Sequence, residues 1–330
     1  MNIGMRGMFR RAMAVTVMAI LAMAMLLVSP SLMAQQRNPA QTIGETVAER
    51  PSAHYRFERF VVSSADGSRR WRVNLGIPTG KPPATGFPAI WMLDGNAALI
   101  EFDDSVLEEL AQTSPSLLVF VGYDNQLRID SPARTRDYTP FADVAEDGTR
   151  SGGGADAFLE TLEEQVRPEV ARRAALDAGQ QTLWGHSLGG LFVLHALYTH
   201  ANAFHIYAAA SPSLWWKQGA MLGTPEQQFL ADTAGRDARL LLMLGGGERN
   251  PDFSSRDMRN PRVVAHLRRV SGAPSGAAAA LATRLQQVPG LQTDYVEFNG
   301  LGHGPMFRAS LMRMLHLVGG IRDRSAEPRP

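Results

Sequence analysis

Two segments near residue 60 alternate between apolar and polar positions. Tyr55 to Ser63 and Arg70 to Ile77 show this alternation, which is typical of half-buried strands, and they flank the turn sequence Ala65-Asp66-Gly67-Ser68. The pattern predicts an antiparallel hairpin. Later apolar runs are continuous, as in strands that are buried on both faces. These runs centre near Ile90, Leu118, Leu183, Ile206, Leu241 and Val296.

Segments with helical periodicity lie between the apolar runs. The predicted helices span Asp104 to Gln112, Ala155 to Ala174, Leu188 to His200, Arg262 to Val270 and Pro305 to Leu317, with a further helix expected within Ser271 to Gln287. Strands that alternate with helices imply an α/β fold. We therefore expect a mostly parallel central sheet with helices on both faces and the antiparallel hairpin at its N-terminal side.

The N-terminus has a different pattern. Three arginines within the first eleven residues precede an uncharged apolar run from Ala12 to Val28, and small residues follow up to Ala34. This order predicts a secretory signal peptide over residues 1–34. An uncleaved membrane anchor is the alternative, because the run approaches the shortest spanning length of about 17 residues. The small residues favour cleavage, so we expect a periplasmic protein without stable membrane insertion.

The remaining chain is predicted to form one domain. Residues 35–54 are polar and should be extended, residues 55–321 should form a single α/β domain, and residues 322–330 should be a flexible tail. The chain contains no cysteine, which excludes disulfides, a thiol nucleophile and a zinc-thiolate site. Its formal net charge is +1, which gives no support to a nucleic-acid partner.

The sequence Gly185-His186-Ser187-Leu188-Gly189 matches G-x-S-x-G and lies between an apolar strand and a helical run. This order is typical of a nucleophile elbow, a sharp strand-to-helix turn that holds a serine in a strained conformation. Ser187 is therefore the candidate nucleophile. A glycine-rich helix start capped by Ser187 is the structural alternative.

A serine hydroxyl needs a base, and the base needs a group that orients it. In an α/β-hydrolase these follow the serine in the order acid and then histidine. His303 lies in the loop Asn299 to Pro305 after a strand-like segment, and Gly302 and Gly304 should let this loop approach the serine. His303 is the candidate base, whereas the other histidines are expected to be ordinary surface or core residues.

The acid is expected after the buried strand Arg239 to Leu244. Glu248 follows that strand and could accept the proton on the histidine Nδ1. Asp252 and Asp257 lie in the same loop and are the alternatives. All three could also be solvated loop carboxylates.

An oxyanion hole is built from backbone amides. One donor should be the N–H of Leu188, directly after the nucleophile. The second should follow the strand Phe87 to Leu93, so we assign the N–H of Gly95, with Asn96 as the neighbouring option. A simple turn at these residues would be compatible with this role.

Together these residues resemble the esterase D-like branch of the α/β-hydrolases, and within it the siderophore esterases that open catecholate trilactones such as enterobactin. The resemblance covers most of the chain after the signal peptide. It rests on Trp91-Met92-Leu93-Asp94-Gly95-Asn96, Arg134 to Pro140, Gly152 to Ala155 with Phe158, Gly185 to Gly190, Ser211 to Trp216, and Gly302-His303-Gly304. It implies a serine esterase in which Ser187 and His303 match the nucleophile and the base. It leaves the acid open, because some periplasmic members resemble Ser-His dyads.

Four further residues are candidates for binding an aromatic, anionic ester. Arg134 and Arg136 are expected on a long loop after the strand Leu117 to Val121. Their guanidinium groups could pair with catecholate or carboxylate oxygens, although Arg136 could instead pair with Asp137. Trp215 and Trp216 could stack on catechol rings, although at least one of them should be core. The expected partner is a small-molecule ester.

The reaction expected of these residues needs no metal or organic cofactor, and any iron would belong to the substrate. Two other functions remain open. A secreted feruloyl, acetyl or general carboxylesterase would use the same residues, and a binding protein could keep the fold without activity.

Overall fold

The structure is a computed structural model that describes residues 40–142, 151–232, 236–249, 259–270, 272–274 and 276–327. The predicted signal peptide therefore lies outside the described residues. Across the described ranges, every helix is too short or too polar to cross a bilayer.

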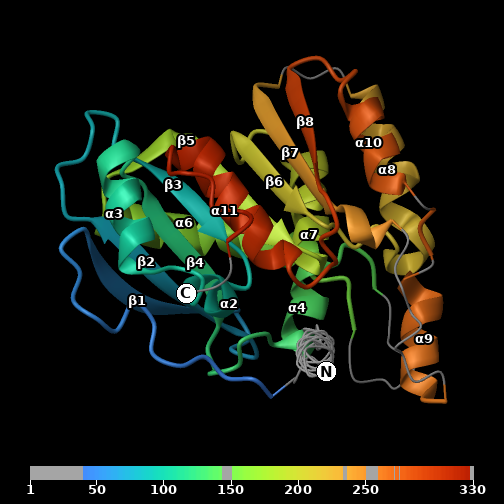
Figure 1. Ribbon diagram of the computed structural model, residues 1–330, viewed down its shortest axis with the longest axis horizontal. Coiled ribbons are helices and arrows are strands. Elements are labelled where there is room, and N and C mark those ends of the chain that lie inside the picture. Colours follow the sequence, from blue (N-terminus) through green and yellow to red (C-terminus); the bar gives the residue numbers. More distant parts are fainter. Residues whose placement is uncertain are drawn as a thin grey trace, which may run out of the picture. The chain divides into compact units, whose positions relative to one another are not determined.

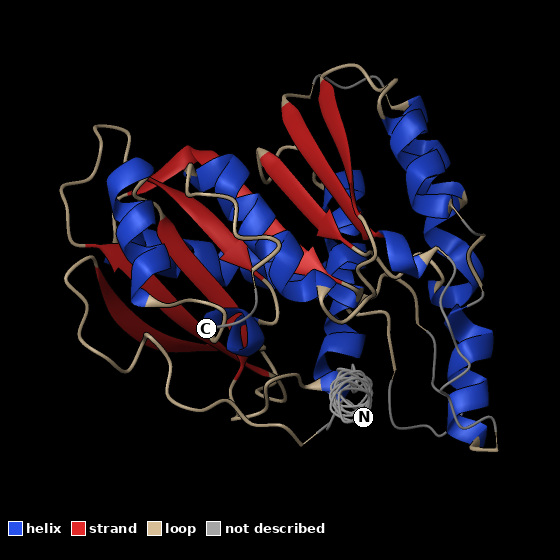
Figure 2. Ribbon diagram, viewed as in Figure 1, coloured by secondary structure: helices blue, strands red, loops and turns tan. Residues whose placement is uncertain are grey.

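Eight strands form one sheet in the order β1-β2-β4-β3-β5-β6-β7-β8 (Figure 1, Figure 2). Their bounds are β1 Tyr55–Ser63, β2 Arg70–Pro78, β3 Phe87–Met92, β4 Leu117–Tyr123, β5 Leu176–His186, β6 Ile206–Ala210, β7 Ala238–Gly245 and β8 Leu291–Phe298. β1 pairs with β2 and β2 pairs with β4 in antiparallel register, and every other neighbouring pair is parallel. The predicted hairpin and the mostly parallel α/β sheet are confirmed.

Helices cover both faces of the sheet because successive strand residues point to opposite sides. On β3, for example, Ile90 and Met92 join one buried cluster, whereas Ala89 and Trp91 join the other. The first cluster is covered by α2 (Gly95–Leu99), α3 (Asp104–Thr113) and α11 (Met306–Gly319). The second is covered by α4 (Ser131–Tyr138), α5 (Ala155–Thr161), α7 (Leu188–Thr199), α8 (Thr224–Ala231) and α10 (Ala277–Leu285).

The helix predicted over Ala155 to Ala174 is interrupted. After α5, a π-helical turn spans Leu162–Val166, and α6 continues over Arg167–Arg173. This turn lies just before Pro168, whose ring would clash with the carbonyl four residues earlier in a regular α-helix. The wider turn lets the helical run continue past the proline.

The segment expected to be a long loop around Arg134 contains the helix α4. Its N-cap, Asp130, accepts a hydrogen bond from the Ala133 amide, and Pro132 lies in the first turn. The helix is short and polar, so it lacks the apolar periodicity on which the prediction relied. The helix α8 was also not predicted, and α9 spans Pro261–Val270. Of the region Ser271 to Gln287, Ala277–Leu285 is the α-helix.

The segments on either side of the predicted domain contribute buried residues. Val47, in the segment predicted to be extended, is 1% exposed. Arg324, in the predicted flexible tail, is also buried and pairs with Glu109, while its Nη1 donates to the Ser105 hydroxyl at 2.9 Å. The described part of the tail therefore packs on α3.

We expect Arg324→Ala to lower the free energy of unfolding by about 1–2 kcal/mol, because it removes hydrogen bonds to a partly buried carboxylate and a hydroxyl. Arg322 pairs with the same Glu109 but is 65% exposed, so Arg322→Ala should change stability by less than about 0.5 kcal/mol. Urea denaturation of both variants measures the difference. Equal losses would mean that the tail is not anchored by the buried arginine.

Candidate active site

Ser187 lies in the sharp turn between β5 and α7 with φ 63° and ψ −117°. Such a backbone is strained for a residue with a side chain. The turn is tight enough that a Cβ on Gly185 would lie 2.4 Å from the carbonyl oxygen of Gly189, and one on Gly190 would lie 2.6 Å from that of Ala210. Because any larger side chain would clash with these backbone atoms, both positions require glycine.

The strand β6 and the loop after it hold this turn. The Ser187 amide donates to the carbonyl of Ala210 at 2.9 Å, and the Ser187 carbonyl accepts from the Ser213 amide at 3.0 Å. The Ser213 hydroxyl also lies 3.3 Å from the Ser187 hydroxyl. The elbow is thus fixed on both sides by the neighbouring strand end.

His303 lies in the loop between β8 and α11, with its ring beside the elbow. Its Nε2 is 2.9 Å from Ser187 Oγ, and its Nδ1 is 2.5 Å from Glu248 Oε2. Because a carboxylate can only accept, Nδ1 carries the proton and Nε2 is left to accept from the serine. The Nε2 of His186 donates to the His303 carbonyl at 3.0 Å and so ties this loop to the elbow.

The glycines beside His303 do not make this approach possible. Outside its chain neighbours, a Cβ on Gly302 or Gly304 would meet no heavy atom within 4 Å, and neither glycine has a left-handed φ. The argument from these two glycines was therefore wrong, although the imidazole lies where it was expected.

Glu248 ends a short 3-10 turn after β7, Gly246–Glu248. Its Oε1 accepts from the Ser211 hydroxyl at 2.6 Å and from the Gly245 amide at 3.0 Å. Burial alone would raise the pKa of this carboxyl, but the hydrogen bond and charge of His303 and the donors Ser211 and Gly245 together lower it. The other acid candidates, Asp252 and Asp257, lie outside the described residues.

Sequence reasoning missed Ser211 and Ser213 as parts of this site. Both follow β6, whose neighbour β5 leads into Ser187, so the strand order could have placed them there. Ser211 is 2% exposed and has a left-handed φ of 42°, which is uncommon for a residue other than glycine.

The two predicted oxyanion donors occupy equivalent places in their elements. Leu188 begins α7 and Gly95 begins α2, and the first amide of a helix has no acceptor within that helix. The residue before Gly95, Asp94, has a left-handed φ of 51°.

Arg134 is held between this turn and the elbow. Its Nε and Nη2 donate to the two oxygens of Asp94 at 2.9 and 2.8 Å, and Nη2 also donates to the His186 carbonyl at 3.2 Å. Burial alone would lower the pKa of Arg134, but the charge and hydrogen bonds of Asp94 raise it. A permanent cation, 11% exposed, is thus fixed next to the residue that precedes Ser187.

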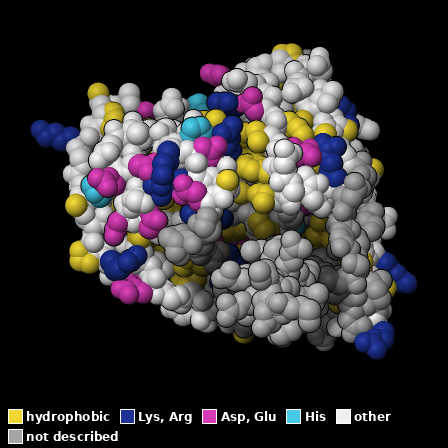
Figure 3. Space-filling view, viewed as in Figure 1, with side chains coloured by type: hydrophobic (Ala, Val, Ile, Leu, Met, Phe, Trp, Pro, Cys, Tyr) yellow, Lys and Arg dark blue, Asp and Glu magenta, His cyan; other side chains and the backbone are white. Residues whose placement is uncertain are grey.

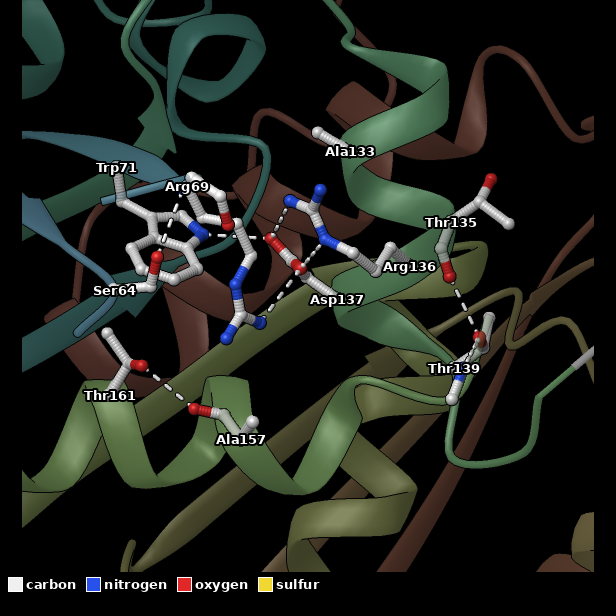
Figure 4. A network of polar contacts seen from close by, with 12 residues as sticks. Ser64, Arg69, Trp71, Ala133, Thr135, Arg136, Asp137, Thr139, Ala157 and Thr161 are labelled. Atoms are coloured by element: carbon white, nitrogen blue, oxygen red, sulfur yellow. Dashed lines mark hydrogen bonds and ion pairs between the residues drawn. The ribbon is translucent and has the colours of Figure 1, made fainter. Parts of the chain in front are cut away.

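Arg136 instead pairs with its neighbour. Asp137 is fully buried and accepts from Arg136 Nε at 2.7 Å and from Trp71 Nε1 at 2.9 Å. Figure 4 shows Arg69 and Arg136 on opposite sides of this carboxylate. Arg136 is therefore paired with Asp137, which is the alternative that the sequence offered to a substrate contact.

The two tryptophans have different environments. Trp216 is 4% exposed and its Nε1 donates to the Phe141 carbonyl at 3.2 Å, so it belongs to the core. Trp215 is half-buried, with its ring centre 6.0 Å from that of Trp216. Of the two, Trp215 is the one with surface left for a ligand.

Within the described ranges, no group of three or more His, Asp or Glu side chains is arranged to hold a metal ion. On the face shown in Figure 3, basic and acidic side chains are interspersed.

A family model described as "Putative esterase" matches residues 64–317 of this chain. The chain belongs to the esterase family. The apo-salmochelin esterase of Escherichia coli O6:H1 is 32% identical over 288 residues, which cover 84% of each chain. The ferri-bacillibactin esterase BesA of Bacillus subtilis is 31% identical over 270 residues, covering 78% of this chain and 88% of its own.

A solved structure of the enterobactin hydrolase IroE in complex with DFP matches with a TM-score of 0.65 and 31% identity, covering 83% of this chain and 99% of that chain. A BES protein from Bacillus cereus matches with a TM-score of 0.66 and 27% identity. The α/β-hydrolase fold, the resemblance to siderophore esterases and the enzyme class, an ester hydrolase, are confirmed.

The lowered pKa of Glu248 predicts a pH dependence of stability. A carboxyl whose pKa is lower in the folded state stabilises the fold above its unfolded pKa, and this contribution is lost as the pH falls through the folded pKa. We therefore expect wild type to lose stability relative to Glu248→Gln as the pH falls below the ordinary value of about 4.5. Urea unfolding of both proteins between about pH 7 and pH 3 measures this, and a difference independent of pH would contradict it.

Proposed function

We propose that this chain is a serine esterase that hydrolyses the ester bonds of a catecholate trilactone siderophore of the enterobactin type. The observation that carries the mechanism is the continuous contact from Ser187 Oγ through the His303 ring to Glu248. Residues from three separate parts of the chain meet there, and their hydrogen-bond donors and acceptors follow the order that proton transfer from the serine requires.

Acylation begins at Ser187. His303 Nε2 takes the hydroxyl proton as Oγ attacks the ester carbonyl carbon, and the imidazolium that forms is stabilised by Glu248. The amides of Leu188 and Gly95 stabilise the tetrahedral oxyanion. His303 then protonates the leaving alcohol, which leaves an acyl group on Ser187.

Deacylation repeats these steps with water. His303 takes a proton from the water that attacks the acyl carbonyl, and it returns a proton to Ser187 Oγ as the acid product leaves. The Ser-His-acid triad is favoured over a dyad because three donors, His303, Ser211 and Gly245, hold the Glu248 carboxylate.

The substrate class is supported by the relatives and by an aromatic side chain that could contact the ester. Relatives that align over most of this chain are named for siderophore hydrolysis. Arg134, a candidate substrate contact, is paired with Asp94 and so contributes by holding the turn that carries Gly95 against the elbow. Trp215 supplies an aromatic surface on which a catechol ring could stack.

The site of action proposed is the periplasm. It rests on the N-terminal order of arginines, apolar run and small residues up to Ala34.

Incubation of the protein with enterobactin should yield linear trimer, dimer or monomer by mass spectrometry, and Ser187→Ala should abolish this turnover. An intact macrolactone in the presence of protein that hydrolyses simple esters would reject the siderophore proposal. Full activity of Ser187→Ala would reject the serine mechanism. A higher kcat/KM on feruloyl or acetyl esters would favour the general carboxylesterase.

Arg134 and Arg136 lie on the same helix and provide a matched pair. Arg134→Gln should lower kcat/KM for the siderophore at least tenfold, because it leaves the buried Asp94 carboxylate without its bidentate partner and so loosens the turn that carries the Gly95 amide. Arg136→Gln should stay within about twofold of wild type, because the Arg136 side chain donates to Asp137 and not to the turn or the elbow. Steady-state kinetics with the siderophore measures both, and equal losses would remove the argument for Arg134.

A further inference from the structure

We propose that Ser211 is a positioning residue that fixes the Glu248 carboxylate for its work with His303. This inference rests on the proposed serine mechanism, in which Glu248 orients the base. Among the hydrogen bonds of the described residues, none joins the Ser211 side chain to Ser187 or to the His303 ring. Its hydroxyl binds Glu248, so it acts through that residue.

The two oxygens of Glu248 have different partners. Oε2 faces His303 Nδ1, whereas Oε1 accepts from the Ser211 hydroxyl at 2.6 Å and the Gly245 amide at 3.0 Å. An ionised carboxylate only accepts hydrogen bonds, so Ser211 must donate. This donation selects one rotation of the carboxylate plane, a torsion that is otherwise broad for glutamate.

Such an anchor adds to the one donor that the turn of Glu248 itself supplies, the Gly245 amide. Glu248 ends a turn of three residues, Gly246–Glu248, and its two neighbours before it are glycines. Ser211 instead directly follows β6, and its amide donates to the Met243 carbonyl of β7 at 2.7 Å. The hydroxyl therefore connects the acid to a rigid strand end.

The backbone of Ser211 indicates that the hydroxyl is what this position requires. Its φ of 42° is left-handed, a conformation that glycine adopts without steric cost. A glycine here would relieve the strain but would bring no donor to Oε1. Strain at a buried, non-glycine residue that contacts an active-site group is typical of functional positions.

Two replacements separate the hydroxyl from the strain. Ser211→Ala removes the donor and keeps the Cβ, and Ser211→Gly removes both. We expect both to lower kcat about tenfold with little change in KM, while Ser211→Gly melts at the same temperature as Ser211→Ala or higher. Circular dichroism measures the folding and melting of each variant, and steady-state kinetics measures kcat and KM. A wild-type kcat in either variant, once it is shown to be folded, would overturn the proposal.

A double-mutant cycle tests whether Ser211 acts through Glu248. In a Glu248→Gln background, Ser211→Ala should lower kcat by less than about twofold, because the acid it positions is already lost. A further tenfold loss would show that Ser211 has an independent structural role and would overturn the proposal.

Ser116→Ala is the matched control. Ser116 is also 2% exposed, and its hydroxyl donates to the Ser114 carbonyl at 2.9 Å, just before β4 and away from Glu248. It should leave kcat unchanged in both backgrounds. Turnover by Ser187→Ala at the wild-type rate would refute the serine mechanism itself, whereas an inactive Ser187→Ala beside fully active Ser211 variants would refute only the positioning role.

Discussion

The strained backbone of Ser187 depends on hydrogen bonds from the neighbouring strand. A left-handed serine costs about 1–3 kcal/mol, and it persists only where the surroundings fix it. Here the Ala210 carbonyl and the Ser213 amide bind the two peptide groups that flank the Ser187 Cα. The parallel pairing of β5 with β6 is therefore a condition for placing the Ser187 hydroxyl beside His303, since a slip in register would remove both bonds.

The same strand end connects the other parts of the site. Through Ser211, the loop after β6 reaches Glu248, and through Ser213 it reaches Ser187. On the opposite side, α4 reaches the turn after β3 through Arg134 and Asp94. The site is thus built from the carboxyl ends of neighbouring parallel strands, where ligands bind in open α/β sheets.

Much of this arrangement could be predicted from the sequence because it is encoded locally. The apolar runs predicted the strands, and the elbow motif placed Ser187 between β5 and α7 as the structure does. The helix α4 could not be predicted from apolar periodicity, since it is polar and tertiary contacts of Arg134, Asp137 and Tyr138 hold it in place.

Contacts between residues that are far apart in the chain were the other feature that the sequence could not predict. The choice between Arg136 as a substrate contact and as the partner of Asp137 depended on Trp71, which is 66 residues away from that carboxylate. The roles of Ser211 and Ser213 likewise depended on which strand neighbours β5. Neither fact is expressed in local composition, because both arise from packing across the sheet.

The empty space around Gly302 and Gly304 has a consequence for substrate choice. A Cβ added at either position would meet no heavy atom within 4 Å outside its chain neighbours. Divergent esterases with this scaffold could therefore carry a small side chain on either side of the base without a clash with the rest of the fold. Selectivity and chemistry would then be separable by changes at the two loop positions that flank His303.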